Sequence, residues 1–475
     1  MSISVTPMRI GSRSVTTDEV MLVRSPYDGR EVGMVPVGTP EHLHAAVEEA
    51  RGRLLGDPIP AHERAAILDR AADALAGRQE EFARLISSES AKPIRTARVE
   101  AARAVDTFRF AAAVARTLTG ETVPLEASAA GVGKIGFVLR VPIGVVGAIS
   151  PFNFPLNLVA HKVAPAIAAG CPVVVKPASA TPLTALALAE LLLDECGLPP
   201  GWLHVVTCPG SVADHLVTHP DVAMITFTGS PAVGWRIRER APRKKVSLEL
   251  GNNSPVVIEP DGDWEVAASK IAVAGYSFAG QSCISVQRVF VHAAIAEQFT
   301  EALTAEVERL VVGDPADEAT DVSALISRSE TERVRAWIDD AVAQGAQLRT
   351  GGDLTEDQVL RPTVLAGVRP EMEICRTEVF GPVVGIQAYD DFREALRLAN
   401  DTRYGLQAGV FTADLAKALE AARTLDFGGV LVNEVPTWRA DQMPYGGVRD
   451  SGNTREGPAY AAREMTEQRL VVLQS

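Results

Sequence analysis

Paired cysteines are missing from this sequence. Its 475 residues include five cysteines, an odd number, with no paired spacing and no CxxC or His/Cys cluster of the kind that holds zinc. We therefore expect neither a disulfide framework nor a metal site, and a chain that stays reduced in the cytoplasm. The cysteines stand at positions 171, 196, 208, 283 and 375.

Long apolar runs and an excess of basic charge are missing as well. No uninterrupted apolar stretch reaches the roughly 18 residues that a membrane-spanning helix needs, and Met1–Arg9 lacks the apolar core of a secretory signal. Lysine and arginine number 46 against 60 aspartates and glutamates, a net charge of −14. This balance argues against nucleic acid or an anionic membrane as a partner, but it leaves room for a local basic pocket.

What remains is an ordinary globular composition, with 47% hydrophobic and 22% charged residues. At about 150 residues per domain, the length predicts two or three domains. A helical region runs from Glu41 to about Ala115, with helices predicted at Glu41–Leu54, Ala61–Ser87 and Arg95–Ala115. An extended segment follows at Gly120–Val141. Two series of short apolar strands alternating with helices come next, which predicts parallel sheets covered on both faces. The predicted helices include Thr181–Cys196, with Thr181 as N-cap and Pro182 at its first position, and Trp264–Ala279. The strand Arg469–Leu473 is expected to pair with Gly120–Val141 or with another subunit.

Cys283 is the cysteine with a candidate chemical role. It stands in Phe278–Arg288, between a helical run and an apolar strand, where a side chain can face a cleft. A thiol is the side chain best suited to attack a carbonyl carbon. Most unpaired cysteines are buried structural residues, and this window alone leaves both interpretations open.

Two further polar residues follow predicted strands, and such sheets bind ligands outside the carboxyl ends of their strands. The amide of Asn153 could donate to an oxyanion or could cap a helix. Glu249 lies between two leucines, where desolvation would raise the pKa of its carboxyl group and suit it to act as a general base. The alternative for Glu249 is a buried, paired carboxylate.

Other residues at strand ends suit a nucleotide. Lys176 ends an apolar strand and could reach ribose hydroxyls or a phosphate, or could extend to solvent. Gly229 and Ser230 open a helix whose free N–H groups would favour a diphosphate, although the spacing is not GxGxxG. Glu378 could bind ribose hydroxyls and Phe380 could pack on a flat ring, or both could belong to an ordinary loop.

These motifs, in this order and over essentially the whole chain, resemble the signature blocks of the aldehyde dehydrogenase superfamily. Together they are far more specific than any one of them. The blocks are PFNFP at 151–155, KPASATP at 176–182, FTGSPAVG at 227–234, LELG at 248–251, GQSCISVQR at 280–288, TEVFGPV at 377–383, NDTRYGL at 400–406 and MPYGGVRDSG at 443–452.

The resemblance implies a role for each matching residue. Cys283 matches the nucleophile, Glu249 the base that activates water, and Asn153, with the backbone N–H of Cys283, the oxyanion hole. The positions that match the cofactor site or its cleft are Ser150, Pro151, Phe152, Lys176, Ser179, Gly229, Ser230, Leu250, Glu378 and Phe380. The implied reaction is NAD(P)-dependent oxidation of an aldehyde to a carboxylic acid through a cysteine thioester.

The implied fold is α/β, with three parts. A Rossmann-like dinucleotide-binding domain with a parallel sheet would comprise residues 1–119 and 142–250. A second α/β domain, 251–433, would carry Cys283. A β-arm for oligomerisation, 120–141 and 456–475, would join subunits into a homodimer or homotetramer.

Two residues depart from the family pattern. Many members have a second glycine after Leu-Glu-Leu-Gly, where this chain has Asn252; Asn tolerates a left-handed backbone, so the turn could survive. Ser179 stands where NAD-preferring members often carry a glutamate that holds the adenosine ribose. A serine removes the charge that would repel a 2′-phosphate, so we expect NADP to be used as well as NAD.

The substrate is expected to be a small anionic aldehyde. The blocks CISVQR and Pro436–Gly447 resemble a subgroup that acts on lactaldehyde, glyceraldehyde 3-phosphate or phosphonoacetaldehyde. The candidate substrate residues are Arg103, His161 and Arg439. Arg103 lies in a helix similar to one that supplies an anion-binding arginine in the phosphate-handling members, Arg439 lies in a loop that resembles their substrate mouth, and His161 lies in the helix after Asn153. A guanidinium fork can bind two oxygens of a phosphate or phosphonate. For each arginine the alternative is a surface salt bridge.

Two other functions compete with this hypothesis. In a CoA-acylating semialdehyde dehydrogenase, CoA would take the acyl group, but such enzymes do not need the water-activating Glu249. A non-catalytic binding protein on the same fold would have no use for an intact set of Cys283, Glu249 and Asn153.

Overall fold

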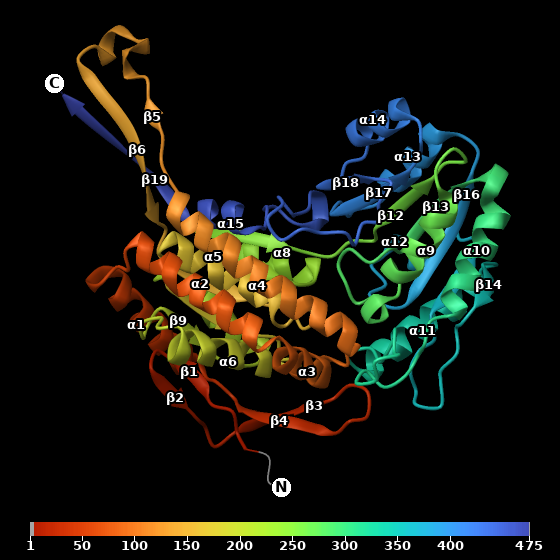
Figure 1. Cartoon of the computed structure of the whole chain (residues 1–475), viewed down its shortest axis with the longest axis horizontal. Coiled ribbons are helices and arrows are strands. Elements are labelled where there is room, and N and C mark those ends of the chain that lie inside the picture. Colours follow the sequence, from red (N-terminus) through yellow and green to blue (C-terminus); the bar gives the residue numbers. More distant parts are fainter. Residues whose placement is uncertain (1–3, 475) are drawn as a thin grey trace.

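The computed structural model describes residues 4–474, so the outermost residues of the predicted first domain and arm lie outside the described part. The chain forms two lobes and a projecting arm (Figure 1). The first lobe contains a seven-stranded sheet in the order β11-β10-β7-β8-β9-β1-β2. Its strands are β1 (Met8–Ile10), β2 (Arg13–Val15), β7 (Val145–Ile149), β8 (Val173–Lys176), β9 (Leu203–Val205), β10 (Val222–Thr228) and β11 (Lys245–Glu249).

The five strands from β11 to β9 run parallel, and β1 and β2 extend the sheet antiparallel. The chain runs from β7 through β8 to β9 on one side, then returns to place β10 and β11 on the other. The strand order therefore reverses between β7 and β10, and a crevice for a ligand forms at the carboxyl ends of such strands. A two-stranded ribbon, β3 (Val20–Arg24) with β4 (Glu31–Pro36), lies apart from this sheet.

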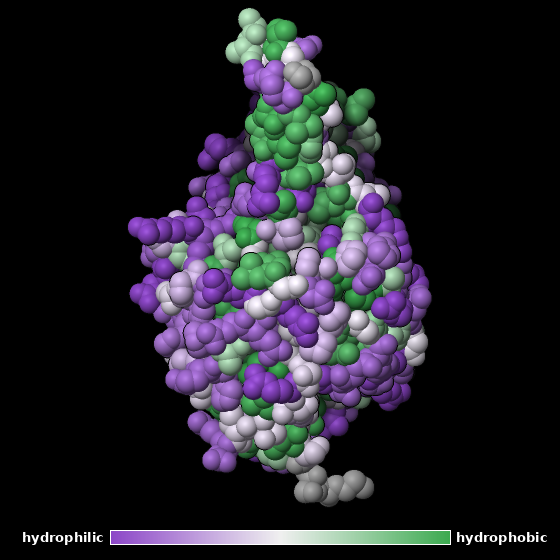
Figure 2. All heavy atoms as spheres, turned by 90° about the vertical axis from the view of Figure 1, so that its left-hand side faces the viewer, coloured by the Kyte–Doolittle hydropathy of each residue, from purple (hydrophilic) through white to green (hydrophobic). Residues whose placement is uncertain are grey.

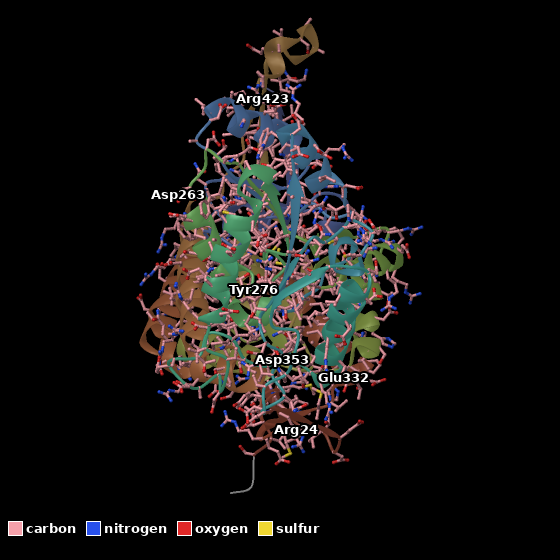
Figure 3. All side chains as sticks on the ribbon, turned by 90° about the vertical axis from the view of Figure 1, so that its right-hand side faces the viewer. Arg24, Asp263, Tyr276, Glu332, Asp353 and Arg423 are labelled. Atoms are coloured by element: carbon pink, nitrogen blue, oxygen red, sulfur yellow. The ribbon has the colours of Figure 1, made fainter. Side chains whose placement is uncertain are left out.

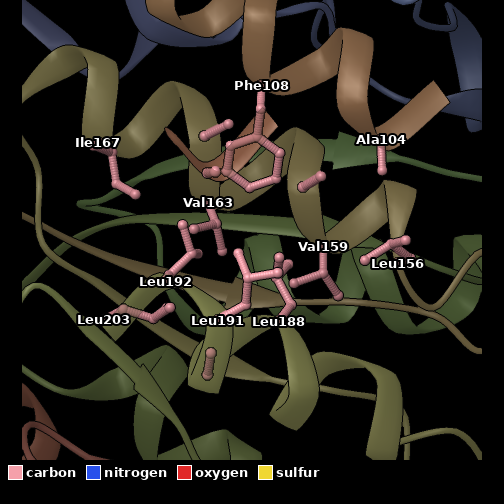
Figure 4. Close-up of a cluster of buried hydrophobic side chains, with 14 of the residues drawn as sticks. Ala104, Phe108, Leu156, Val159, Val163, Ile167, Leu188, Leu191, Leu192 and Leu203 are labelled. Atoms are coloured by element: carbon pink, nitrogen blue, oxygen red, sulfur yellow. The ribbon is translucent and has the colours of Figure 1, made fainter. Parts of the chain in front are cut away.

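Helices cover this sheet. They are α1 (Pro40–Gly56), α2 (Ala61–Gly77), α3 (Gln79–Ser90), α4 (Ile94–Thr117), α5 (Asn157–Ala169), α6 (Leu183–Glu190), α7 (Gly210–Thr218) and α8 (Pro231–Arg240). Figure 4 shows Phe108 of α4 packed toward Val163 of α5, which is buried on all sides.

Two helix predictions in this lobe were wrong in detail. The segment predicted as one helix from Ala61 to Ser87 is two helices, α2 and α3, because the backbone leaves the helical conformation at Arg78. The helix predicted to start with Thr181 as its cap starts at Leu183. Its first N–H groups are satisfied by the buried carboxylate of Glu89, which accepts from Leu183 N at 2.9 Å.

The second lobe has its own seven-stranded sheet in the order β14-β15-β16-β13-β12-β17-β18, parallel except for β14. The strands β14 to β17 were not predicted. The sheet comprises β12 (Pro255–Ile258), β13 (Arg288–His292), β14 (Gln347–Thr350), β15 (Thr363–Ala366), β16 (Val383–Tyr389), β17 (Gln407–Phe411) and β18 (Gly429–Val432).

Helices surround this second sheet as well. They are α9 (Trp264–Ala274), α10 (Ala296–Glu308), α11 (Arg328–Ala343), α12 (Glu373–Arg376), α13 (Phe392–Asn400) and α14 (Leu415–Thr424). Tyr276 lies inside this lobe, whereas charged residues such as Glu332, Asp353 and Arg423 lie outside (Figure 3). The α/β fold class predicted from the sequence is confirmed. The domain limits stay a prediction.

The arm is a three-stranded sheet in the order β19-β6-β5. The strand β19 (Thr466–Gln474) follows α15 (Pro458–Glu464) and pairs antiparallel with β6 (Lys134–Pro142) along its length. The short β5 (Thr122–Val123) pairs with the other edge of β6. The expected pairing of the C-terminal strand with the 120–141 segment is thus confirmed.

The arm carries apolar side chains into solvent (Figure 2). Ile135, Leu470 and Leu473 are each more than half exposed. Across residues 4–474, every helix is too short or too polar to span a bilayer.

Candidate active site

A cavity of about 1270 Å³ lies at the carboxyl ends of β7, β8 and β10, where the two lobes meet. Its walls include Cys283, Glu249 and Asn153, the three predicted catalytic residues. They also include all ten residues predicted for the cofactor: Ser150, Pro151, Phe152, Lys176, Ser179, Gly229, Ser230, Leu250, Glu378 and Phe380. The fold therefore brings thirteen residues from distant motifs to one place.

Cys283 is partly exposed in this cavity, whereas the other four cysteines are buried. The helix predicted to run to Ala279 ends at Ala274, and Phe278 and Ala279 take positive φ values of 51° and 53°. This unusual backbone turns the chain toward the cavity just before Cys283. Burial raises the pKa of the Cys283 thiol to about 12, so the resting residue carries its proton at neutral pH.

Asn153 is tied to the segment that carries the nucleophile. Its Nδ2 donates to the carbonyl oxygen of Gln281 at 3.0 Å, which leaves its second amide hydrogen for an oxyanion. The alternative of a helix cap is wrong, because the Glu100 carboxylate accepts the N–H groups at the start of α5, from Leu156 at 2.9 Å. Lys92 pairs with Glu100 and donates to Asn153 O at 2.6 Å, which holds the Asn153 backbone.

Glu249 ends β11 with its carboxylate buried. Both of its oxygens lack a hydrogen-bond partner within the described part of the chain, so the alternative of a paired carboxylate does not hold. Burial, and then the nearby charge of Glu456, raise the pKa of Glu249 well above its usual range. Gly446 makes this position possible, since a Cβ there would lie 2.8 Å from Glu249 Oε1. A carboxyl group of raised pKa is suited to take a proton from water.

The backbone of Asn252 is not left-handed, because its φ is not positive. The suggestion that Asn replaces glycine there by tolerating that conformation is therefore wrong. The side chain of Asn252 is buried instead, and Nδ2 donates to Ser254 Oγ at 2.8 Å and to Gln407 O at 3.2 Å. Asn252 thus holds the chain after Glu249 in place, where a glycine would leave it free.

The cavity fits a dinucleotide. Ser230 is the N-cap residue before α8, and its side chain makes no capping hydrogen bond, so N–H groups in the first turn of the helix remain available to a diphosphate. Glu378 accepts the N–H of Asn252 at 3.0 Å, and burial raises the pKa of its carboxyl group to about 7. Ser150 Oγ is buried without a partner among the described residues. The ring of Phe380 lies edge-on to that of Phe152 at 5.8 Å.

The three predicted substrate residues cluster around Asp441, away from the walls of the cavity. Arg103 donates to Asp441 through Nη2 at 2.8 Å and through Nε at 3.1 Å. His161 Nε2 lies 2.9 Å from Asp441 Oδ1 and 3.2 Å from Arg439 Nη2. The side chain of Arg439 is buried and pairs with Glu456 at 2.8 Å, so it is not in a surface salt bridge.

Four residues of the site escaped the sequence reasoning: Lys162, Asp441, Tyr445 and Glu456. Lys162 is buried in α5 and donates to Thr228 Oγ1 at 2.7 Å. Asp441 and Tyr445 stand in the block around Arg439, where their polarity among Gly and Pro residues was a usable signal. Tyr445 Oη lies 2.9 Å from Cys283 Sγ.

Comparison with known proteins places the chain in a family. The aldehyde dehydrogenase family profile matches residues 13–471, so the chain belongs to the aldehyde dehydrogenase family. It is an NAD(P)-dependent aldehyde dehydrogenase, as the sequence predicted. A 3-sulfolactaldehyde dehydrogenase of Priestia aryabhattai is 47% identical over 459 residues, 96% of each chain.

Solved structures agree with this assignment. Aldehyde dehydrogenase 21 of Physcomitrella patens, solved with its reaction product succinate, has 39% identity, a TM-score of 0.95 and coverage of 100% of this chain and 99% of that one. An NADP-dependent glyceraldehyde-3-phosphate dehydrogenase of Bacillus halodurans C-125, complexed with NADP, has 37% identity, a TM-score of 0.96 and 99% coverage of both. The predicted cofactor, NAD or NADP, is confirmed.

Proposed function

We propose that this enzyme oxidises a small anionic aldehyde to its carboxylic acid through a thioester on Cys283. The observation that supports it is the position of Cys283 between two different environments. On one side lies the cavity with Glu249 and Asn153. On the other, reached through Tyr445, lies the cluster of Arg103, His161 and Arg439.

In the first half of the reaction, the Cys283 thiol loses its proton to water and the sulfur bonds to the aldehyde carbon. The carbonyl oxygen becomes an oxyanion, which the free amide hydrogen of Asn153 and the backbone N–H of Cys283 stabilise. NAD or NADP, when bound in the cavity, accepts the hydride that leaves this carbon. The product on the enzyme is a thioester.

In the second half, Glu249 takes a proton from water as the water oxygen attacks the thioester carbon. The C–S bond breaks, the acid leaves and the sulfur is regenerated. Glu249 can do this because its oxygens have no other partner. A water-activating base in the cavity supports hydrolysis and makes transfer to CoA unnecessary.

The charges of the cluster favour a monoanionic head group. Asp441 and Glu456 already offset the charges of Arg103 and Arg439, so these four groups together carry no net charge. A phosphate or phosphonate approaches two negative charges at pH 7, whereas a sulfonate carries one. We therefore place a sulfonate ahead of the phosphate and phosphonate first expected, in line with the sulfolactaldehyde specificity named for the Priestia relative.

The guanidinium of Arg103 is the group best placed to bind that anion. Its Nε and Nη2 hold Asp441, its Nη1 makes no hydrogen bond to the described residues, and its side chain is 25% exposed. Asp441 therefore orients the guanidinium and leaves one edge free. Burial lowers the pKa of His161, which can act as a neutral partner.

The test is Arg103→Met, assayed with 3-sulfolactaldehyde, phosphonoacetaldehyde and lactaldehyde. The native enzyme should have its highest kcat/KM with the sulfonate. In the variant, kcat/KM for the sulfonate should fall about tenfold to hundredfold, which corresponds to one charge-assisted hydrogen bond. The kcat/KM for neutral lactaldehyde should fall less than about threefold.

Arg109→Met is the matched control, because Arg109 lies on the same helix with an exposed side chain and only a distant ion pair, 3.8 Å from Asp106. This variant should keep the native kcat/KM with all three substrates. An equal loss on charged and neutral aldehydes in Arg103→Met, or a native preference for lactaldehyde, would refute an anion-binding role.

We also propose a homodimer or homotetramer in the cytoplasm. The apolar residues exposed along β6 and β19 support association through the arm. The five cysteines are all free, which suits a reducing compartment. Light scattering should give two or four times the chain mass of 50.5 kDa, and a monomer would exclude this role for the arm.

A further inference from the structure

The hydroxyl of Tyr445 is the one polar side-chain group within hydrogen-bond distance of the nucleophile among the described residues. Its Oη lies 2.9 Å from Cys283 Sγ and makes no other hydrogen bond there. Tyr445 is 3% exposed, so solvent does not compete strongly for this contact. The isolated bridge between Tyr445 and Glu456 fixes the tyrosine backbone.

The ring of Tyr445 is equally constrained. The guanidinium of Arg439 lies over it, 3.8 Å from the ring centroid, and is itself held by Glu456. A cation on the face of a phenol withdraws electron density from the ring. The hydroxyl therefore becomes a stronger donor while its position is fixed by packing.

We propose that Tyr445 is a catalytic residue that donates its hydroxyl to the Cys283 thiolate, with Arg439 as a positioning residue behind it. Tyr445 keeps its own proton throughout, because burial raises the pKa of its phenol. The sulfur loses its proton to water, and the O–H then points at the thiolate until the C–S bond forms. This inference rests on Cys283 being the nucleophile.

Other charged groups around Cys283 act in different directions. Glu378 and Glu249 oppose the thiolate when they are ionised, and Arg439 favours it. The hydrogen bond from Tyr445 lowers the pKa of Cys283 and thus works against burial, which raises it. Loss of the hydroxyl should therefore move the thiolate titration to higher pH.

The test is Tyr445→Phe, which keeps the ring under Arg439 and removes only the hydroxyl. We expect the rate of Cys283 alkylation by iodoacetamide at pH 8, followed by mass spectrometry, to fall about tenfold. The variant should need a pH about one unit higher to reach the native alkylation rate. The kcat/KM should fall by a similar factor for charged and neutral aldehydes alike, since the lost contact is to the sulfur.

Tyr276→Phe is the control, because it removes another fully buried hydroxyl, one that donates to Thr363 O at 2.9 Å. It should leave the alkylation profile unchanged. An unchanged profile in Tyr445→Phe, or an equal shift in Tyr276→Phe, would overturn the inference. If Cys283→Ser loses all activity while Tyr445→Phe keeps the native alkylation profile, only the role of Tyr445 is refuted. If Cys283→Ser stays active, the proposed function is refuted as well.

Discussion

The charged groups on the two sides of Cys283 are held in different ways. On the cofactor side, a wide cavity contains buried polar atoms without protein partners, namely both oxygens of Glu249 and Ser150 Oγ. On the anion side, Asp441 alone accepts from Arg103, His161 and Asn157. Two buried nitrogens on the anion side, His161 Nδ1 and Arg439 Nε, also lack partners among the described residues, so both sides keep polar atoms for a ligand. The difference is that the arginines of the anion side are paired with carboxylates of the protein, whereas the Glu249 carboxylate is not paired. The anion side has its charges fixed before substrate arrives.

This difference predicts that the cofactor side will be changed most by an added charge. Ser179→Glu should place a carboxylate where a 2′-phosphate would bind, beside Lys176. We expect kcat/KM for NADP to fall by about tenfold to a hundredfold, equivalent to about 1.4–2.8 kcal/mol of lost binding. The value for NAD should change little. Steady-state kinetics with both cofactors measure this.

Ser179→Ala is the matched control, since it removes the hydroxyl without adding charge. Its ratio of NADP to NAD efficiency should stay close to the native one. A native enzyme that already rejects NADP strongly would contradict the assumed role of Ser179.

A smaller effect should come from the protonation of Glu378. Burial raises the pKa of its carboxyl group to about 7, so the group is mostly protonated at pH 6 and mostly ionised at pH 8. Only the ionised form accepts two ribose hydroxyls well. The KM for the cofactor should therefore rise about fivefold to tenfold as the pH falls across this window, and the dependence should flatten in Glu378→Gln. A KM that is flat between pH 6 and pH 8 in the native enzyme would count against Glu378 as the ribose ligand.

The sequence predicted the cofactor side better than the anion side. Motifs such as Gly229–Ser230 and Lys176 lie at strand ends, and the parallel sheet brings those ends together whatever lies elsewhere. The anion side depends on pairs such as Arg103 with Asp441, which are 338 residues apart. No local pattern predicts a pairing at that distance. The sequence therefore left each arginine between an anion site and a surface salt bridge, and it did not identify the carboxylates.

Local helix rules failed for a related reason. Thr181 followed by Pro182 is a good helix start, but the buried Glu89 supplies the cap from a distant helix and moves the start to Leu183. The helix before Cys283 ends early, at Ala274, and Phe278 and Ala279 then adopt positive φ, a conformation that no residue preference there favours. The surrounding structure imposes it next to the nucleophile.

The most direct measurement follows Glu249→Gln through a single exposure to aldehyde and oxidised cofactor. If Cys283 carries the acyl group and Glu249 releases it, reduced nicotinamide should appear in a burst of one equivalent per chain and then stop. Intact-mass analysis should find the acyl group on Cys283. Continued turnover at the native rate, or an unmodified Cys283 after the burst, would contradict the mechanism.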